Sequence, residues 1–147
     1  MKARHVLAFS ALFALVGAPA AQGARPMTLE DLLKTVRVTD PQLSRDGRNV
    51  AFVRTTTDLD SGKRNADVWL MPSDGSTSAR ALTRHEKSDS APRFSPDGTR
   101  LAFVSARNGT PQVYTLELNG GEPQRLTSLS AGVSDPLVWS PDGKHVA

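Results

Sequence analysis

The sequence predicts an all-β fold, a partial β-propeller with two four-stranded blades and the start of a third. One short pattern occurs three times, as PQLSRDGRNVAFV from Pro41, PRFSPDGTRLAFV from Pro92 and LVWSPDGKHVA from Leu137. Its serines stand at positions 44, 95 and 140, a spacing of 51 and then 45 residues. Repeats of this length, each holding several short strands, are typical of propeller blades.

The N-terminus predicts a secretory signal peptide over residues 1–23. Lys2 and Arg4 precede the apolar run Val6–Val16, and the small residues Ala18–Ala20 follow it, which is the order of a basic, an apolar and a cleavage region. A membrane anchor is the alternative, but the apolar run is short for a bilayer span. We therefore expect a secreted or periplasmic protein without a membrane anchor after cleavage.

Residues 27–40 are expected to form a short lead-in helix and a linker. Thr28 and Asp31 have the spacing of a capping box, with Asp in place of the usual Glu or Gln. Four apolar residues then fall on one helical face, and this face is predicted to pack against the propeller: Leu29, Leu32, Leu33 and Val36.

The propeller itself is predicted over residues 41–147. Blade 1 covers about 41–83, blade 2 about 92–127, and blade 3 starts at 137. The alternation of large and small residues predicts four strands in blade 2: Arg93–Ser95, Arg100–Ser105, Gln112–Leu118 and Gln124–Thr127. In blade 1, the polar segment Thr55–Ala66 is expected to form an extended hairpin loop on the rim.

The repeated Ser-Pro-Asp-Gly motif predicts a hairpin turn. Pro96 suits the first central position of a type I turn, Asp97 the second, and Gly98 tolerates a positive φ. Asn119–Gly121 and Ser73–Gly75 predict further turns. The repeated aspartates of the motif are expected to stabilise their own turns rather than to act as catalytic carboxylates: Asp46, Asp97 and Asp142.

Composition excludes several kinds of site. The chain has no cysteine, so it has neither disulfides nor cysteine-bound metal. Its net charge is +3, and removal of Lys2 and Arg4 with the signal peptide leaves +1. The remaining charges are scattered over turns, so nothing indicates nucleic-acid binding.

Motif searches predict no catalytic, cofactor-binding or metal-binding residue. The sequence contains neither G-x-S-x-G nor a phosphate-binding glycine loop, and its three histidines lie far apart. Asp58 and Asp60 lack the remaining oxygen ligands of a calcium loop, and the sequon at Asn108 is attributed to chance. Four aromatic residues recur at repeat positions and are predicted to pack between blades: Trp69, Phe94, Tyr114 and Trp139.

The segment Met27–Pro72, with the element R-N-x-D-x-W-L at Arg64–Leu70, resembles bacterial secreted serine peptidases of the prolyl oligopeptidase family. The resemblance is to their acylaminoacyl-peptidase and dipeptidyl-peptidase-like branch, and it continues to Ala147. It implies a propeller that restricts the access of peptide substrates to a C-terminal α/β-hydrolase domain with a Ser-Asp-His triad. No residue here matches the triad motifs, so the resemblance carries over no catalytic residue.

We therefore expect this chain to be the N-terminal portion of such a peptidase, inactive alone, with the hydrolase domain as its missing partner. Its third repeat stops within a strand, which predicts open blade faces, an unpaired edge near Val146 and a tendency to aggregate. The alternative is a TolB-like periplasmic propeller that acts as a non-catalytic interaction module. TolB-like proteins carry a sizeable domain before the propeller, for which the short lead-in leaves no room.

Overall fold

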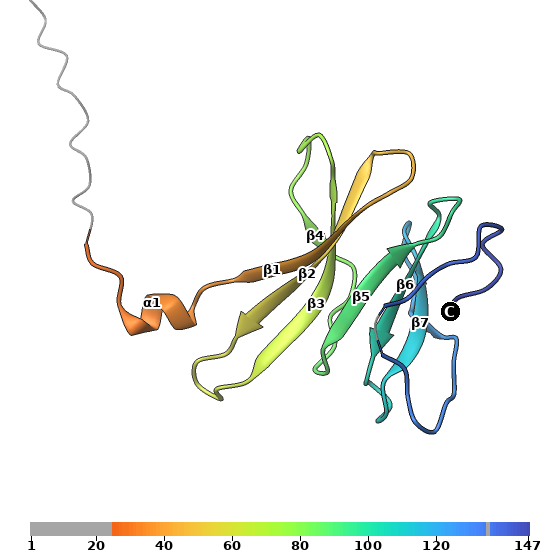
Figure 1. The fold of residues 1–147 in the computed structure, drawn as a ribbon. Coiled ribbons are helices and arrows are strands. Elements are labelled where there is room, and N and C mark those ends of the chain that lie inside the picture. Colours follow the sequence, from red (N-terminus) through yellow and green to blue (C-terminus); the bar gives the residue numbers. More distant parts are fainter. Residues whose placement is uncertain (1–24, 135) are drawn as a thin grey trace, which may run out of the picture.

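A computed structural model describes residues 25–134 and 136–147 (Figure 1). The predicted signal peptide lies outside the described residues. The structure contains two four-stranded antiparallel sheets, with strand orders β1-β2-β3-β4 and β5-β6-β7-β8. In the third repeat, Trp139 and Val146 form an isolated antiparallel bridge. The predicted all-β fold, two blades and the start of a third, is confirmed.

Each sheet is one blade, built from strands that follow one another in sequence. Blade 1 consists of β1 (Arg37–Leu43), β2 (Asn49–Thr57), β3 (Arg64–Pro72) and β4 (Arg80–Ala81). Blade 2 consists of β5 (Asp89–Phe94), β6 (Arg100–Ser105), β7 (Gln112–Glu117) and β8 (Gln124–Arg125). The predicted turns at Ser73–Gly75 and Asn119–Gly121 follow β3 and β7, where they lead into the short fourth strands.

The lead-in helix α1 (Leu29–Leu33) has the predicted capping box. The Asp31 amide donates to Thr28 Oγ1 over 3.2 Å, and the Thr28 amide donates to the Asp31 carboxylate over 2.9 Å. The prediction that its apolar face packs against the propeller is wrong, since Leu29 is 72% exposed and no helical residue is buried. The helix ends shortly before β1 begins, so it lies beyond the end of that strand instead of folding back over a sheet (Figure 1).

The first strands of both blades begin earlier than predicted, at Arg37 and Asp89, because each contains a bulge. The pairing register shifts within each strand. At the shift, Asp40 and Ala91 have positive φ angles of 48° and 52°, and each precedes a proline that has no N–H to donate to the ladder. The bulge interrupts the alternation from which strand starts are predicted.

Half of the expected rim loop Thr55–Ala66 is strand. Residues 55–57 of β2 pair with residues 64–66 of β3, which leaves only residues 58–63 as the loop. The Asp58 amide donates to the Lys63 carbonyl over 2.8 Å and closes it. Three consecutive threonines have high β propensity, and this outweighs the polar composition that predicted a loop.

The main hydrophobic core lies between the facing sides of the two sheets. Blade 1 contributes Ala51, Val68 and Leu70, and blade 2 contributes Leu101, Phe103, Tyr114 and Leu116. Phe103 is fully buried and stacks on Tyr114 with ring centroids 5.9 Å apart. Full burial of a side chain of this size stabilises the fold by roughly 1.5–3 kcal/mol.

A second core lies on the opposite side of blade 2. Ala91, Ala102, Val104 and Val113 of the blade pack against the C-terminal segment. Its buried residue there is Leu137, and Val133, Trp139 and Val146 are partly buried. Figure 1 shows this last segment, in dark blue, beside blade 2 on the side away from blade 1. Blade 2 is therefore covered on both faces.

Three of the four predicted blade-packing aromatics lie in these cores. Tyr114 is buried in the first core, Phe94 packs at its margin, and Trp139 packs in the second. Trp69 does not pack between the described blades, because it pairs with Phe52 on the face of blade 1 that points away from blade 2. There the Arg54 guanidinium covers its ring at 4.4 Å.

The repeated aspartates stabilise their turns, as predicted. In each motif the serine hydroxyl donates to the aspartate, over 2.6 Å at Asp46, 2.6 Å at Asp97 and 2.5 Å at Asp142. Each carboxylate also accepts a backbone N–H two residues later, over 3.1 Å. These bonds, that from the Ser95 hydroxyl above all, lower the pKa of Asp97 to about 2.

Replacement of Phe103 by Ala should cost about 3–5 kcal/mol of unfolding free energy, because it leaves a cavity between the blades. Urea unfolding followed by circular dichroism would measure this loss. Val38→Ala serves as the control, since Val38 is exposed and its truncation should cost less than about 0.5 kcal/mol. Equal effects of the two substitutions would contradict the inter-blade core.

The Ser-Asp turns should make stability depend on pH. The pKa of Asp97 is lower in the folded chain than the value of about 3.9 of an unfolded aspartate. The turn's contribution is therefore complete above about pH 4 and is lost as the pH falls towards 2. Urea midpoints of the natural chain and of Asp97→Asn should converge over this interval. A constant difference from pH 7 to pH 2 would refute the role of the carboxylate.

Candidate functional site

The best candidate for a functional site is the edge formed by the first strands of the blades. Arg93 on β5 forms a salt bridge with Asp40 on β1, over 2.9 Å, and both side chains are largely shielded from solvent. Gln42 donates to the other Asp40 carboxylate oxygen over 2.7 Å. The bulge at Asp40 therefore lies at the ion pair that connects blade 1 to blade 2.

The third repeat continues this edge. Trp139 Nε1 donates to the Arg93 carbonyl over 3.0 Å, and the Arg100 guanidinium lies 5.2 Å from the centre of the Trp139 ring. A groove of about 480 Å³ runs along the three units. Its lining combines polar side chains such as Gln42 and Arg45 with apolar ones such as Leu137. In a propeller the blades surround a central channel, so a groove shared by successive first strands belongs to the channel side.

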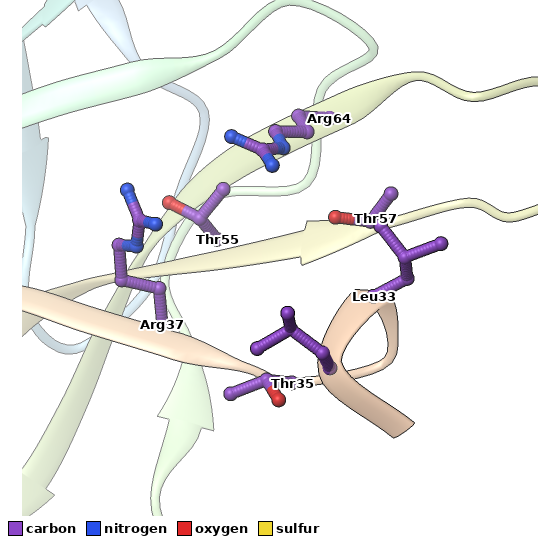
Figure 2. Close-up of a pocket in the computed structure, with 7 residues that line it drawn as sticks. Leu33, Thr35, Arg37, Thr55, Thr57 and Arg64 are labelled. Atoms are coloured by element: carbon purple, nitrogen blue, oxygen red, sulfur yellow. The ribbon is translucent and has the colours of Figure 1, made fainter. Parts of the chain in front are cut away.

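A second hollow of about 270 Å³ lies between α1 and the end of blade 1 (Figure 2). Arg37 pairs with Thr55, and Arg64 pairs with Thr57, so all four side chains lie on one face of the sheet. Leu33 points towards Thr57 from the helix (Figure 2). Among residues 25–134 and 136–147, neither arginine has a carboxylate within salt-bridge distance. The hollow is positively charged and offers hydrogen-bond donors.

The most buried charge pair among the described residues has a structural role. Asp89, fully buried, accepts from Arg107 over 3.0 Å, and the same guanidinium lies over the rings of Phe103 and Tyr114. This arrangement neutralises a buried carboxylate at the margin of the main core. The Tyr114 hydroxyl is also buried, and it has no hydrogen-bond partner among the residues that the structure describes.

The described residues do not bring together a catalytic constellation. His85 lies between the blades and His145 in the third repeat, whereas His5 lies outside the described residues. Asp58 is occupied by the Ser61 hydroxyl and the Asp60 amide, and this lowers its pKa. Between residues 25 and 147, leaving out residue 135, there is no group of three side chains suited to a metal ion. No helix in the same part of the chain is long and apolar enough to cross a membrane.

The sequence patterns did not reveal the charged residues at the edge formed by the first strands, Asp40 and Arg93, or those in the hollow beside α1. Arg93 and Asp40 belong to different blades and lie 53 positions apart in the sequence. No local motif predicts that they form an ion pair. Arg37 and Arg64 likewise meet only through strand pairing. The one available signal was the position of Arg93, in a strand that recurs in each repeat.

Comparison with known proteins identifies relatives with this architecture. The chain is 38% identical over 121 residues to an uncharacterized peptidase, YuxL, of Bacillus subtilis, a match that covers 82% of this chain and 18% of the relative. It is 37% identical over 101 residues to a TolB homolog of Chlorobium luteolum, covering 68% and 22%. The chain thus spans less than a quarter of the length of either relative.

Among solved structures, an acylaminoacyl peptidase of Pyrococcus horikoshii shares the fold. The TM-score is 0.61 at 24% identity, and the match covers 78% of this chain and 17% of the peptidase. The family described as the Tricorn protease N-terminal beta propeller domain matches residues 63–147, from the end of the loop between β2 and β3 through the third repeat. With two propeller blades in the structure and peptidases among its relatives, the chain belongs to this family of N-terminal propeller domains.

Proposed function

We propose that this chain is the N-terminal propeller part of a secreted serine peptidase, in which the propeller restricts the access of peptide substrates to a C-terminal α/β-hydrolase domain. The observation that carries the proposal is the 38% identity to a peptidase over 82% of the chain. That alignment is 20 residues longer than the one with the TolB homolog, and so favours the peptidase.

A propeller suits this role because the width of its central channel limits which substrates can pass through it. An extended peptide exposes backbone donors and acceptors along its length, and the groove along the first strands is lined by polar side chains, among them Gln42, Arg45 and Arg93. A folded protein is too wide to enter a ring of blades. The groove along the first strands would therefore guide peptides, while the chemistry belongs to the hydrolase domain.

Secretion or periplasmic export is part of the proposal and rests on the signal-like order of residues 1–23. The hydrolase domain and peptide substrates are the partners it requires. A second candidate function, a TolB-like interaction module without catalysis, is favoured by the 37% identity to the TolB homolog.

The two functions differ in whether the complete gene product contains a reactive serine. We expect the protein made from the whole reading frame to be labelled by a fluorophosphonate probe, which reacts with activated serine nucleophiles. It should also release the N-terminal residue from an acylated peptide. The chain of residues 25–147 serves as the control and should show neither reaction. A complete product that the probe does not label would favour the TolB-like function.

The proposed control of access predicts that the Asp40–Arg93 ion pair between the blades affects which peptide lengths are cleaved. Asp40→Asn removes the charge that joins β1 to β5 and should loosen the inner edge. In the complete protein, kcat/KM for long peptides should then rise relative to that for dipeptide substrates, measured by chromatography of the products. Thr99→Ala, in an exposed turn of blade 2, is the control and should leave the ratio unchanged. If Asp40→Asn leaves the ratio of kcat/KM for long peptides to that for dipeptides unchanged, the contact between β1 and β5 does not control access.

A further inference from the structure

The hollow beside α1 lies on a part of blade 1 that the packing of the blades does not use. By the repeat spacing of 51 residues, β6 corresponds to residues 49–54 of β2. The last three residues of β2, 55–57, thus have no counterpart in blade 2, and neither do residues 64–66 of β3, which pair with them. None of the strand residues that line the hollow belongs to either core cluster. This extension of the hairpin is therefore available for another role.

Two arginines and two threonines line this hollow from three strands. Arg37 on β1 pairs with Thr55 of β2. Arg64 on β3 pairs with Thr57 of β2, so the arginines lie at diagonal positions on either side of β2. Figure 2 shows both guanidinium groups on the same face of the sheet as the threonine hydroxyls. The hollow therefore offers two positive charges together with hydroxyl groups that can donate hydrogen bonds.

The acidic side chains nearest to these arginines in the sequence already have partners. Asp31 of α1 accepts two hydrogen bonds from the Arg25 guanidinium, and these bonds hold the pKa of Asp31 well below its usual range. Glu30 forms a salt bridge with Lys34, and Asp58 accepts hydrogen bonds from within its own loop. In the described part of the chain, the two arginines of the hollow therefore have no acidic partner, and their charge is available to a ligand.

The charge and the lining of the hollow indicate the class of ligand. A phosphate monoester carries a charge of about −1.5 to −2 at pH 7, which two guanidinium groups can balance, whereas a carboxylate carries a single charge. Arginine also suits phosphate because its planar group donates two parallel hydrogen bonds to phosphate oxygens. From α1, Leu32 and Leu33 line the hollow, and both are exposed. With a volume of about 270 Å³, the hollow is larger than one phosphate ion, so it leaves room beside the leucines for an apolar substituent.

We propose that the hollow beside α1 binds a phosphate monoester that carries an apolar substituent. Arg37 and Arg64 bind the phosphate group, and the hydroxyls of Thr55 and Thr57 donate hydrogen bonds to its oxygens. The apolar substituent contacts Leu33 and its neighbour on the helix. The hollow shares no lining residue with the groove along the first strands. The proposal is therefore independent of how that groove handles peptides and of any peptidase activity.

A titration of the isotope-labelled chain with phenyl phosphate, followed by NMR, tests this site. The amide signals of Thr55, Thr57 and Arg64 should shift, whereas that of Trp139, in the groove, should not. Benzenesulfonate has the same ring and a single charge, and it should bind at least about tenfold more weakly because a charged hydrogen bond is lost. Inorganic phosphate lacks the ring and should bind at least about threefold more weakly. Equal affinities for phenyl phosphate and either of the other two ligands would overturn the proposal.

Arg37→Gln and Arg64→Gln test the two charges of the hollow. Each should weaken the binding of phenyl phosphate at least about tenfold, since a hydrogen bond between charged groups is lost. Both arginines are exposed, so the urea midpoint of the chain should not change. Arg48→Gln is the matched control, because it removes the same charge from an exposed turn at the opposite end of β2, and it should leave the Kd unchanged. An unchanged Kd in Arg37→Gln or in Arg64→Gln would refute the proposed site.

Leu33→Ala separates the two parts of the ligand. Leu33 is exposed, so its truncation should leave the fold intact. It should weaken the binding of phenyl phosphate about threefold, because an apolar contact is lost, and leave the Kd of inorganic phosphate unchanged. If Leu33→Ala bound both ligands as the natural chain does, the substituent would not contact α1, contrary to the proposal. Because these measurements use the chain alone, their outcome is separate from that of the fluorophosphonate assay.

Discussion

The packing of large side chains on one sheet against small ones on the next holds this structure together. Phe103 and Tyr114 fit over Ala51 and Val68, and this contact sets the spacing and orientation of the blades. Blade 2 is covered by blade 1 on one face and by the C-terminal segment on the other, whereas blade 1 is covered on one face only among the described residues. A propeller blade is stable only between neighbours, so the identity of the neighbour at each face decides how much of the ring is held together.

Electrostatic contacts act at the edges of this packing. The Asp40–Arg93 pair joins the first strands, and the fully buried Asp89 is neutralised by Arg107 beside the main core. Such pairs add less stability than the core because desolvation offsets much of their attraction. The Asp40–Arg93 pair has a positioning role, since it holds β1 and β5 together beside the groove. The proposed access role depends on that placement, because peptides would meet the first strands before any catalytic group.

Local chemistry explains which parts of the fold could be predicted. The turns were predictable because serine, aspartate and glycine act within a few residues of one another, as at Ser95 and Asp97. The helix cap at Thr28 was predictable for the same reason. The candidate site was not, because Asp40 and Arg93 come from different repeats and no local pattern joins them. A hairpin was predicted beyond Thr55, but the extension of β2 and β3 into it was missed, because the prediction gave the polar composition more weight than the β propensity of threonine.

The sequence by itself determined the repeat, the turn chemistry and the number of strands in each blade, because these follow from residues close together in the chain. Only the tertiary structure decided which side of each strand is covered. Trp69 and Tyr114 occupy the same repeat position, yet one lies on an open face and the other in the core. Alternation shows that a strand has two faces, but burial depends on whether another sheet is present. For the same reason, the apolar face of α1 was predictable while its exposure was not.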